Sequence, residues 1–153
     1  MRKAIQPIVE GHGEVDAVPL LLRRLLHEAG VYALDINQPH RKHRVVVANR
    51  EYEAWFAATM ESLRGRRGIS ADAASHPSPE SLKSAKEYVE KRMQSGAYKE
   101  RTDQPALTNA FDLAVAYRRC RSFRRLVKVV GALVREVDVE LTEWPPAAWN
   151  QPP

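Results

Sequence analysis

The sequence predicts an α/β fold with a small parallel sheet flanked by helices and a helical C-terminal half. Segments typical of strands and helices alternate near the N-terminus, and only helical segments follow. The run Val45-Val46-Val47-Ala48 is continuous and rich in β-branched residues, as buried parallel strands are. With 153 residues, 44% of them hydrophobic and 28% charged, the chain fits one domain that buries roughly two-thirds of its surface.

The first two elements are a strand and an amphipathic helix. Lys3–Val9 is apolar enough for a strand, but Pro7 cannot donate to a ladder and indicates an edge or an irregular start. Apolar residues recur at three- and four-residue steps over Val15–Glu28, which predicts a helix. Pro19 falls within its first turns, where proline is tolerated, and Gly30 is a suitable helix stop.

The next segments complete the predicted sheet. Val31–Ile36 is a candidate second strand, and Val45–Ala48 is a stronger one. A helix is expected over Tyr52–Leu63, followed by a loop over Gly65–Gly68.

Three further helices are expected in the C-terminal half. Ser78-Pro79-Glu80 combines a capping hydroxyl, a proline and an early acid, and predicts a helix that runs to about Met93. Asp103 is a suitable cap for a helix over Gln104–Tyr117. Ser122 is expected to begin the last helix, Phe123–Val137.

The chain is expected to form one domain over residues 1–140, with a proline-rich tail over 141–153 that is disordered or acts as a strap. No apolar run approaches the roughly 20 residues that a membrane span needs, so we expect no membrane partner. The single cysteine, Cys120, excludes an internal disulfide and fits a reducing cytoplasm. We therefore expect a cytoplasmic protein.

A pair of carboxylates flanks a glycine turn between the first strand and the first helix. Glu10 ends the strand, Gly11 and Gly13 form the turn with His12 between them, and Glu14 opens the helix. Glycines let the backbone approach a ligand closely, and oxygen ligands suit a divalent cation. His12 is a candidate metal ligand or proton shuttle, or an exposed loop residue. The alternative is an ordinary turn in which Glu14 only favours the helix start.

Glu53 is a third candidate carboxylate, because it follows the strongest predicted strand. The carboxyl ends of parallel strands are where α/β proteins place their sites. Glu53 is therefore expected either to join Glu10 and Glu14 around one Mg²⁺ or Mn²⁺ ion, or to be an exposed first-turn glutamate. The neighbouring Trp55 and Phe56 are expected in the core.

Basic residues are concentrated in three clusters, and the chain carries a net charge of +5 with a pI of about 9.6. The C-terminal cluster is of one sign, which suits contacts with the phosphates of DNA or RNA. The alternative is a solvated helix face. Its candidate nucleic-acid contacts are Arg118, Arg121, Arg124 and Arg125.

Three segments in order resemble the DUF4276 family, whose opening motif is similar to that of TOPRIM-type domains. The opening Val9-Glu10-Gly11-x-Gly13-Glu14 matches the motif, and Val46–Phe56 resembles the family's LANREFEAWF segment. The third stretch follows its C-terminal pattern at Lys83–Lys86, Tyr98-Lys99, Thr102–Gln104, Leu107, Phe111-Asp112, Cys120, Ser122–Arg124 and Leu126. The resemblance covers Ile5 to Leu133 and adds Lys86 to the candidate nucleic-acid contacts.

The resemblance implies a TOPRIM-like fold, in which Glu10 works with an Asp-x-Asp pair on a later strand and the acids bind Mg²⁺. Here no Asp-x-Asp precedes Val45. Only Val31–Arg44 separates the first helix from Val45, too little for a βαβ unit of about 30 residues. The interval looks like an internal deletion, and Glu10, Glu14 and Glu53 remain as candidate metal ligands.

Two classes of function follow. The first is a Mg²⁺-dependent nuclease or phosphodiester-transfer domain, with Glu10 and Glu14 as its catalytic residues. The second is a catalytically inactive protein that binds nucleic acid or a partner, because the Asp-x-Asp pair is missing. Relatives of this kind often accompany an ATPase in defence-type systems, so the resemblance implies a partner ATPase. Sheet edges exposed by a lost unit would also favour a homo-oligomer.

Overall fold

A computed structural model of the protein describes residues 4–9, 11–41, 51–94, 96–136, 141 and 143–151, with only the backbone for 40–41. Glu10 and the predicted strand Val45–Ala48 lie outside the described residues. The strands are β1 (Ala4–Ile5), β2 (Ile8–Val9), β3 (Asp35–Ile36) and β4 (His40–Arg41). The helices are α1 (Glu14–Glu28), α2 (Glu53–Ala58), α3 (Met60–Leu63), α4 (Ala85–Glu90), α5 (Glu100–Thr108), α6 (Leu113–Arg119) and α7 (Arg121–Glu136), with 3₁₀ helices η1 (Pro79–Ser81) and η2 (Ala147–Asn150).

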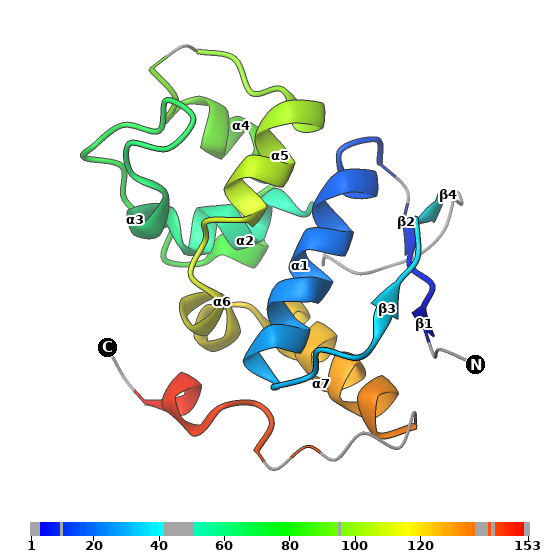
Figure 1. The fold of residues 1–153 in the computed structure, drawn as a ribbon. Helices are drawn as coiled ribbons and strands as arrows, with labels where there is room; N and C mark the ends of the chain where they lie inside the picture. Colours follow the sequence, from blue (N-terminus) through cyan, green and yellow to red (C-terminus); the bar gives the residue numbers. More distant parts are fainter. Residues whose placement is uncertain are drawn as a thin grey trace.

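The described chain is mixed α/β, with small parallel strand pairs near the N-terminus and helices in the C-terminal half, which confirms the predicted fold class (Figure 1). β1 pairs with β3, and β2 pairs with β4. The predicted strand Lys3–Val9 is divided at Gln6 and Pro7. Proline has no N–H to donate, and the Gln6 side chain instead donates to the Gln38 carbonyl at 2.7 Å. β3 is also shorter than the predicted Val31–Ile36.

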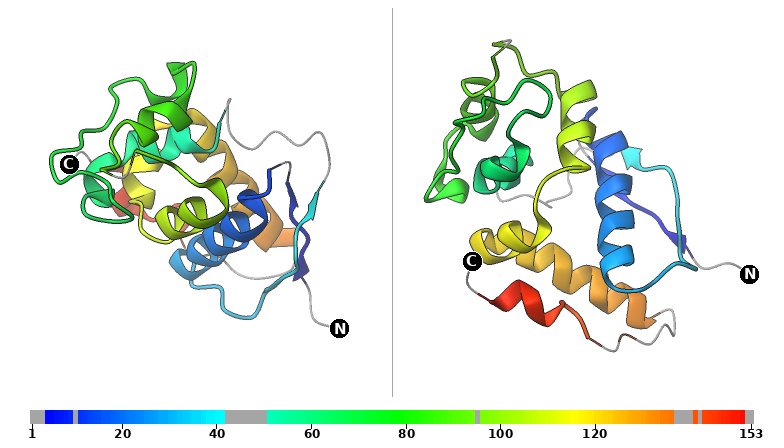
Figure 2. Two further views of the ribbon diagram at one scale, coloured as in Figure 1. Left: turned by 90° about the horizontal axis from the view of Figure 1, so that it is seen from above. Right: turned by 60° about the vertical axis from the view of Figure 1, so that its left-hand side comes forward.

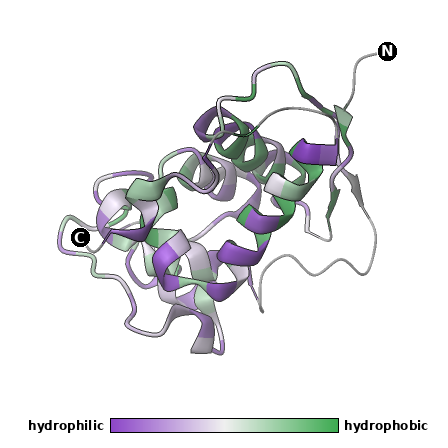
Figure 3. Cartoon of the chain, turned by 90° about the horizontal axis from the view of Figure 1, so that it is seen from below, coloured by the Kyte–Doolittle hydropathy of each residue, from purple (hydrophilic) through white to green (hydrophobic). Residues whose placement is uncertain are grey.

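α1 confirms the predicted helix and begins one residue earlier, at Glu14. It lies between the strand pairs and the remaining helices (Figures 1 and 2). One side of the helix enters the core, with Leu21, Leu25 and Leu26 buried. Figure 3 colours the chain by hydropathy and shows this segregation, with hydrophobic residues on one side of a helix and hydrophilic residues on the other.

The predicted helix Tyr52–Leu63 is two helices, α2 and α3, separated at Thr59. The φ of Thr59 is −127°, outside the helical region. The amide of Met60 donates to the Ser75 hydroxyl at 2.9 Å instead of continuing the helical ladder. A side chain from a distant loop therefore helps to end α2.

The prediction of one continuous helix from Ser78 to Met93 is wrong. Only η1 and α4 form, with Leu82 in an extended conformation between them. Ser84 is the cap of α4, because its hydroxyl accepts from the Glu87 amide at 3.2 Å. This segment therefore contains two helix starts, one after Ser78 and one after Ser84, where one was predicted.

The predicted helix Gln104–Tyr117 is also two helices. α5 begins at Glu100, so Asp103 lies inside its first turn, where its carboxylate accepts from the Lys99 amide at 2.7 Å. Asp112 caps the second helix, α6, by accepting from the Val115 amide at 2.8 Å. The interruption turns the chain between α5 and α7 (Figure 1).

α7 runs from Arg121 to Glu136, which matches the predicted last helix within two residues at its start. It closes the core around an aromatic cluster. Trp55 and Phe56 are fully buried there, as predicted. Edge-to-face contacts with ring centroids 5.2–5.7 Å apart join Trp55 to Phe123, Phe56 to Phe111 and Phe111 to Phe123.

The described part of the tail lies against α6 and α7 (Figure 2). The Trp144 indole donates to the Val127 carbonyl at 2.8 Å. Trp149 is buried, and its ring centroid lies 5.6 Å from that of Tyr117. Residues 143–151 therefore form a strap. None of the helices within the described ranges combines the length and apolar character needed to cross a membrane.

Candidate functional site

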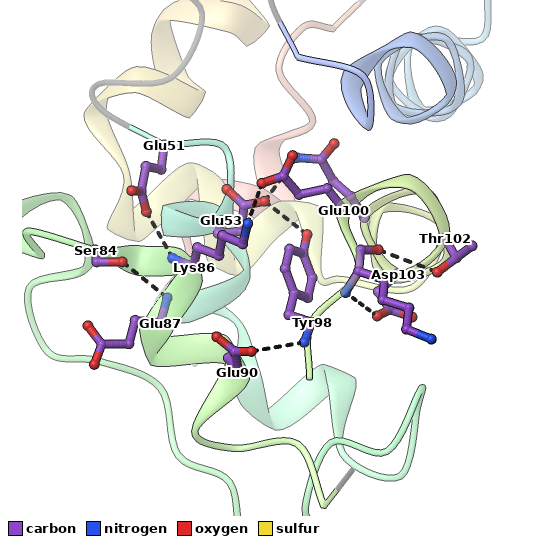
Figure 4. A network of polar contacts seen from close by, with 12 residues as sticks. Glu51, Glu53, Ser84, Lys86, Glu87, Glu90, Tyr98, Glu100, Thr102 and Asp103 are labelled. Atoms are coloured by element: carbon purple, nitrogen blue, oxygen red, sulfur yellow. Dashed lines mark hydrogen bonds and ion pairs between the residues drawn. The ribbon is translucent and has the colours of Figure 1, made fainter. Parts of the chain in front are cut away.

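The N-terminal ends of α2, α4 and α5 meet at one cluster of polar side chains, which we call the acidic cluster (Figure 4). The start of α1 packs beside it, because Gly13 lies against the backbone of Glu100. Helix N-termini carry partial positive charge and stabilise nearby carboxylates. The members of the acidic cluster are Glu51, Glu53, Lys86, Tyr98, Glu100 and Gln104.

Glu53 is the buried centre of the acidic cluster. Its Oε1 atom accepts from the Tyr98 hydroxyl at 2.9 Å and from Gln104 Nε2 at 3.1 Å. The residue is only 5% exposed, so the alternative of an exposed first-turn glutamate is wrong. Burial raises the pKa of the Glu53 carboxyl above its ordinary value, and the charges of Glu100 and Glu51 act in the same direction.

Gln104 connects Glu53 to the start of α1. Its Nε2 atom donates to Glu53, while its buried Oε1 atom has no hydrogen-bond partner among the described residues. This oxygen faces Gly13: a Cβ atom at that position would collide with it and would lie 2.8 Å from the Glu100 carbonyl oxygen. The glycine therefore allows α1 and α5 to approach closely beside Glu53.

Lys86 lies among the acids of the cluster. Its Nζ atom is 2.7 Å from Glu100 Oε1, and its backbone amide donates to Glu51 Oε2 at 2.8 Å. The Glu100 carboxylate raises the pKa of Lys86 above its ordinary value. The expected nucleic-acid contact is therefore already paired with a carboxylate in this structure.

Glu14 lies at the start of α1, where its Oε2 atom accepts from the Gly11 amide at 3.1 Å. Burial raises the pKa of Tyr52, and the charges of Glu14 and Glu53 raise it further, so both carboxylates act on one buried tyrosine. Glu10 lies outside the described residues, and His12 is exposed. Within the described ranges, no three His, Cys, Asp or Glu side chains form a group that could hold a metal ion.

Comparison with protein families identifies the chain. The model of the family described as "Domain of unknown function (DUF4276)" matches residues 32–130. The chain belongs to the DUF4276 family. Neither a search among curated proteins nor one among solved structures found a match. In the DUF4276 chain the acidic cluster falls entirely within the matched residues.

The predicted arginine cluster of the DUF4276 chain divides into two groups. Arg124 Nη1 donates to the carbonyls of Tyr117 and Arg118, at 3.0 and 2.8 Å, and so caps the end of α6. Arg118 is half-buried, and its Nη1 atom lies 3.5 Å from the Trp149 carbonyl oxygen. Arg121 and Arg125 are exposed on α7. Two of the four arginines therefore contact the protein's own backbone.

We predicted no site role from the sequence for Tyr98, Gln104, Glu100 or Glu51. Tyr98 and Gln104 belong to the pattern shared with the DUF4276 family, and that pattern was the signal that could have found them. Nothing local marks them, because they meet Glu53 across 45 and 51 positions of the chain.

Replacing Glu53 by Gln is expected to stabilise the DUF4276 chain near neutral pH. The raised pKa means that the folded chain retains a proton that the unfolded chain loses as pH rises above 4.5, so the native carboxyl costs stability as pH rises through its folded pKa. Gln keeps an oxygen for Tyr98 and has no such cost. Urea unfolding should show a stability advantage for Glu53→Gln that grows with pH. An advantage that is the same below pH 4.5 and near neutrality would contradict the assignment.

Proposed function

We propose that this DUF4276 protein is a Mg²⁺-dependent nuclease or phosphodiester-transfer domain that acts at the acidic cluster. The observation that carries the proposal is the buried carboxylate of Glu53, oriented by Tyr98 and Gln104 beside Glu100 and Glu51. A buried carboxylate with a raised pKa in such surroundings is a common mark of a functional site.

The residues present fit one Mg²⁺ ion better than two. Mg²⁺ often uses one or two carboxylates and keeps several waters. Glu53 and Glu14, whose charges both raise the pKa of Tyr52, would supply two carboxylates, and Glu10 would be the third ligand. The unpartnered Oε1 atom of Gln104, beside Gly13, is a further oxygen close to Glu53.

The chain's own residues would orient the ligands and hold the proton. A bound Mg²⁺ ion supplies charge neutralisation at a phosphate and activation of water. Tyr98 and Gln104 both donate to Glu53 Oε1 and so fix the orientation of its carboxylate. Because its pKa is raised, Glu53 is better suited than an ordinary glutamate to hold a proton and release it.

The proposal is tested by measuring Mn²⁺ binding by calorimetry together with cleavage of DNA and RNA. We expect both signals to be lost in Glu10→Ala and in Glu53→Gln, which removes a charge without removing the side chain. The matched control is Glu87→Gln, because Glu87 is an exposed glutamate of α4 whose carboxylate pairs with Lys91 at the end of the same helix. Cleavage that is equal in Glu53→Gln and the wild type, or absent with every divalent cation, would contradict the proposal.

The second candidate is a catalytically inactive protein that binds nucleic acid or a partner. It is favoured by the lack of a three-ligand group within the described ranges, together with the lack of an Asp-x-Asp pair before Val45. A partner ATPase and a homo-oligomer belong to this candidate. Nucleic-acid or ATPase binding without Mn²⁺ binding would distinguish it from the nuclease.

A further inference from the structure

Three cations lie along the side of α7 that faces away from the core. Arg121, Arg125 and Lys128 follow one another at steps of four and three residues, so they share one face of the helix. All three are exposed. We call them the outer stripe. It extends over about 10 Å, given a rise of about 1.5 Å per residue.

The packing of α7 fixes the direction of the outer stripe. The buried side chains of the helix lie on the opposite face: Phe123, Val127, Val130 and Val134. Trp144 of the tail covers a flank, where its Nε1 atom would lie 2.7 Å from a Cβ atom at Gly131. α7 therefore cannot rotate to bury the stripe without breaking the core.

The side-chain nitrogens of the outer stripe are uncommitted within the described part of the chain, since they make no hydrogen bond or ion pair there. Arg119 differs, because it donates to the carbonyls of Ala58 and His76 at 2.9 and 2.7 Å. Glu80 lies at the start of α7, where its carboxylate accepts from the backbone amides of Arg121 and Ser122 at 2.7 and 2.8 Å. Its charge is used to cap the helix.

We infer that the outer stripe of α7 binds the phosphodiester backbone of a nucleic acid, without reading its sequence. The choice of nucleic acid rests on the proposed function. Guanidinium and ammonium groups of one sign, spaced along one helix, complement a row of phosphates. A lipid surface fits less well, because a helix that binds membranes inserts its apolar face. On α7 the apolar side chains opposite the stripe, Phe123, Val127, Val130 and Val134, are already buried in the core, although Val129 on a flank is 53% exposed.

The test measures binding of a fluorescent DNA duplex of mixed sequence by anisotropy, in EDTA and over a range of KCl concentrations. The stripe variant carries Arg121→Gln, Arg125→Gln and Lys128→Gln. The matched control carries Arg23→Gln, Lys83→Gln and Arg101→Gln, which removes the same charge from exposed positions elsewhere. Arg125→Gln alone is a milder variant in case the triple change impairs folding.

We expect the stripe variant to bind at least about tenfold more weakly, with the slope of log affinity against log salt reduced by about 2–3, because each lost phosphate contact removes about 0.9. Arg125→Gln should reduce the slope by about 1. The control should change both quantities much less. Equal losses in the stripe and control variants, no wild-type binding at low salt, or stripe-dependent binding to phosphatidylserine vesicles but not to DNA would overturn the inference.

The failure of the inference is distinguishable from the failure of the proposed function. Binding in EDTA needs no metal ion, so the duplex-binding measurement reports on the stripe whether or not the protein cleaves nucleic acid. Stripe-dependent binding without any cleavage would overturn the nuclease and retain the inference. If the stripe variant binds and cleaves the duplex as the wild type does, the inference is overturned and the nuclease is retained.

Discussion

Replacing Gly13 by Ala is expected to destabilise the protein by about 1–3 kcal/mol, the usual cost of forcing an extra methyl group into a packed site. The new Cβ atom would collide with Gln104 Oε1 and lie 2.8 Å from the Glu100 carbonyl oxygen and 3.0 Å from its carbon. Backbone atoms of α5 cannot move aside as a flexible side chain can. α1 and α5 would have to separate beside Glu53.

The conformation of Gly13 isolates this steric effect. Its φ of −68° and ψ of −32° are helical, so alanine is not strained there and has the better helix propensity. Gly11→Ala is the matched control, because the nearest atoms to its Cβ among the described residues would be side-chain atoms of Glu14, at 3.6 Å or more. Thermal unfolding should show a loss of several degrees for Gly13→Ala and little change for Gly11→Ala. Similar melting temperatures for the two variants would show that α1 and α5 are not packed as described.

Replacing Phe111 by Ala is expected to cost about 3–5 kcal/mol, the range for truncating a buried aromatic residue. Phe111 is fully buried and contacts Phe56 and Phe123 with ring centroids 5.7 Å away in each case. Arg24 of α1 lies over the ring at 5.3 Å and donates to the Phe111 carbonyl at 2.9 Å. The ring therefore joins α1, α2 and α7.

The effect of Phe111→Ala is measured by urea unfolding, with Tyr32→Ala as its control. Tyr32 is an aromatic residue that is 76% exposed, so its truncation should change the free energy of unfolding by less than about 0.5 kcal/mol. A loss below about 1 kcal/mol for Phe111→Ala would contradict the central position of this ring. If the variant is too unstable to purify, Phe111→Leu tests the same contacts with a smaller cavity.

The helices α1 and α7 could be predicted closely from sequence, because an amphipathic period is a local property of the chain. The predicted starts differ from the observed starts by one and two residues. Helix interruptions were predicted poorly because distant groups decide them. Ser75 takes the amide at which α3 begins, and Glu51 accepts from the first turn of α4.

In the candidate site, too, residue types could be predicted from the sequence, whereas contacts between distant residues could not. Sequence and resemblance selected Glu14 and Glu53 as acids of interest, together with Glu10, which lies outside the described residues. They could not show that Glu53 is buried, that Tyr98 and Gln104 donate to it, or that Lys86 is paired with Glu100. These contacts depend on how four helix starts converge.

The sequence alone determined the mixed α/β class, the positions of the longest helices and the burial of Trp55 and Phe56, because hydrophobic period and residue type carry that information. Only the tertiary structure decided which charges are committed. It paired Lys86 with Glu100 and Arg124 with the end of α6, and it left Arg121 and Arg125 exposed on the outer face of α7. The physical reason is that a charge is satisfied by groups near it in space, and those groups are brought near by packing between helices.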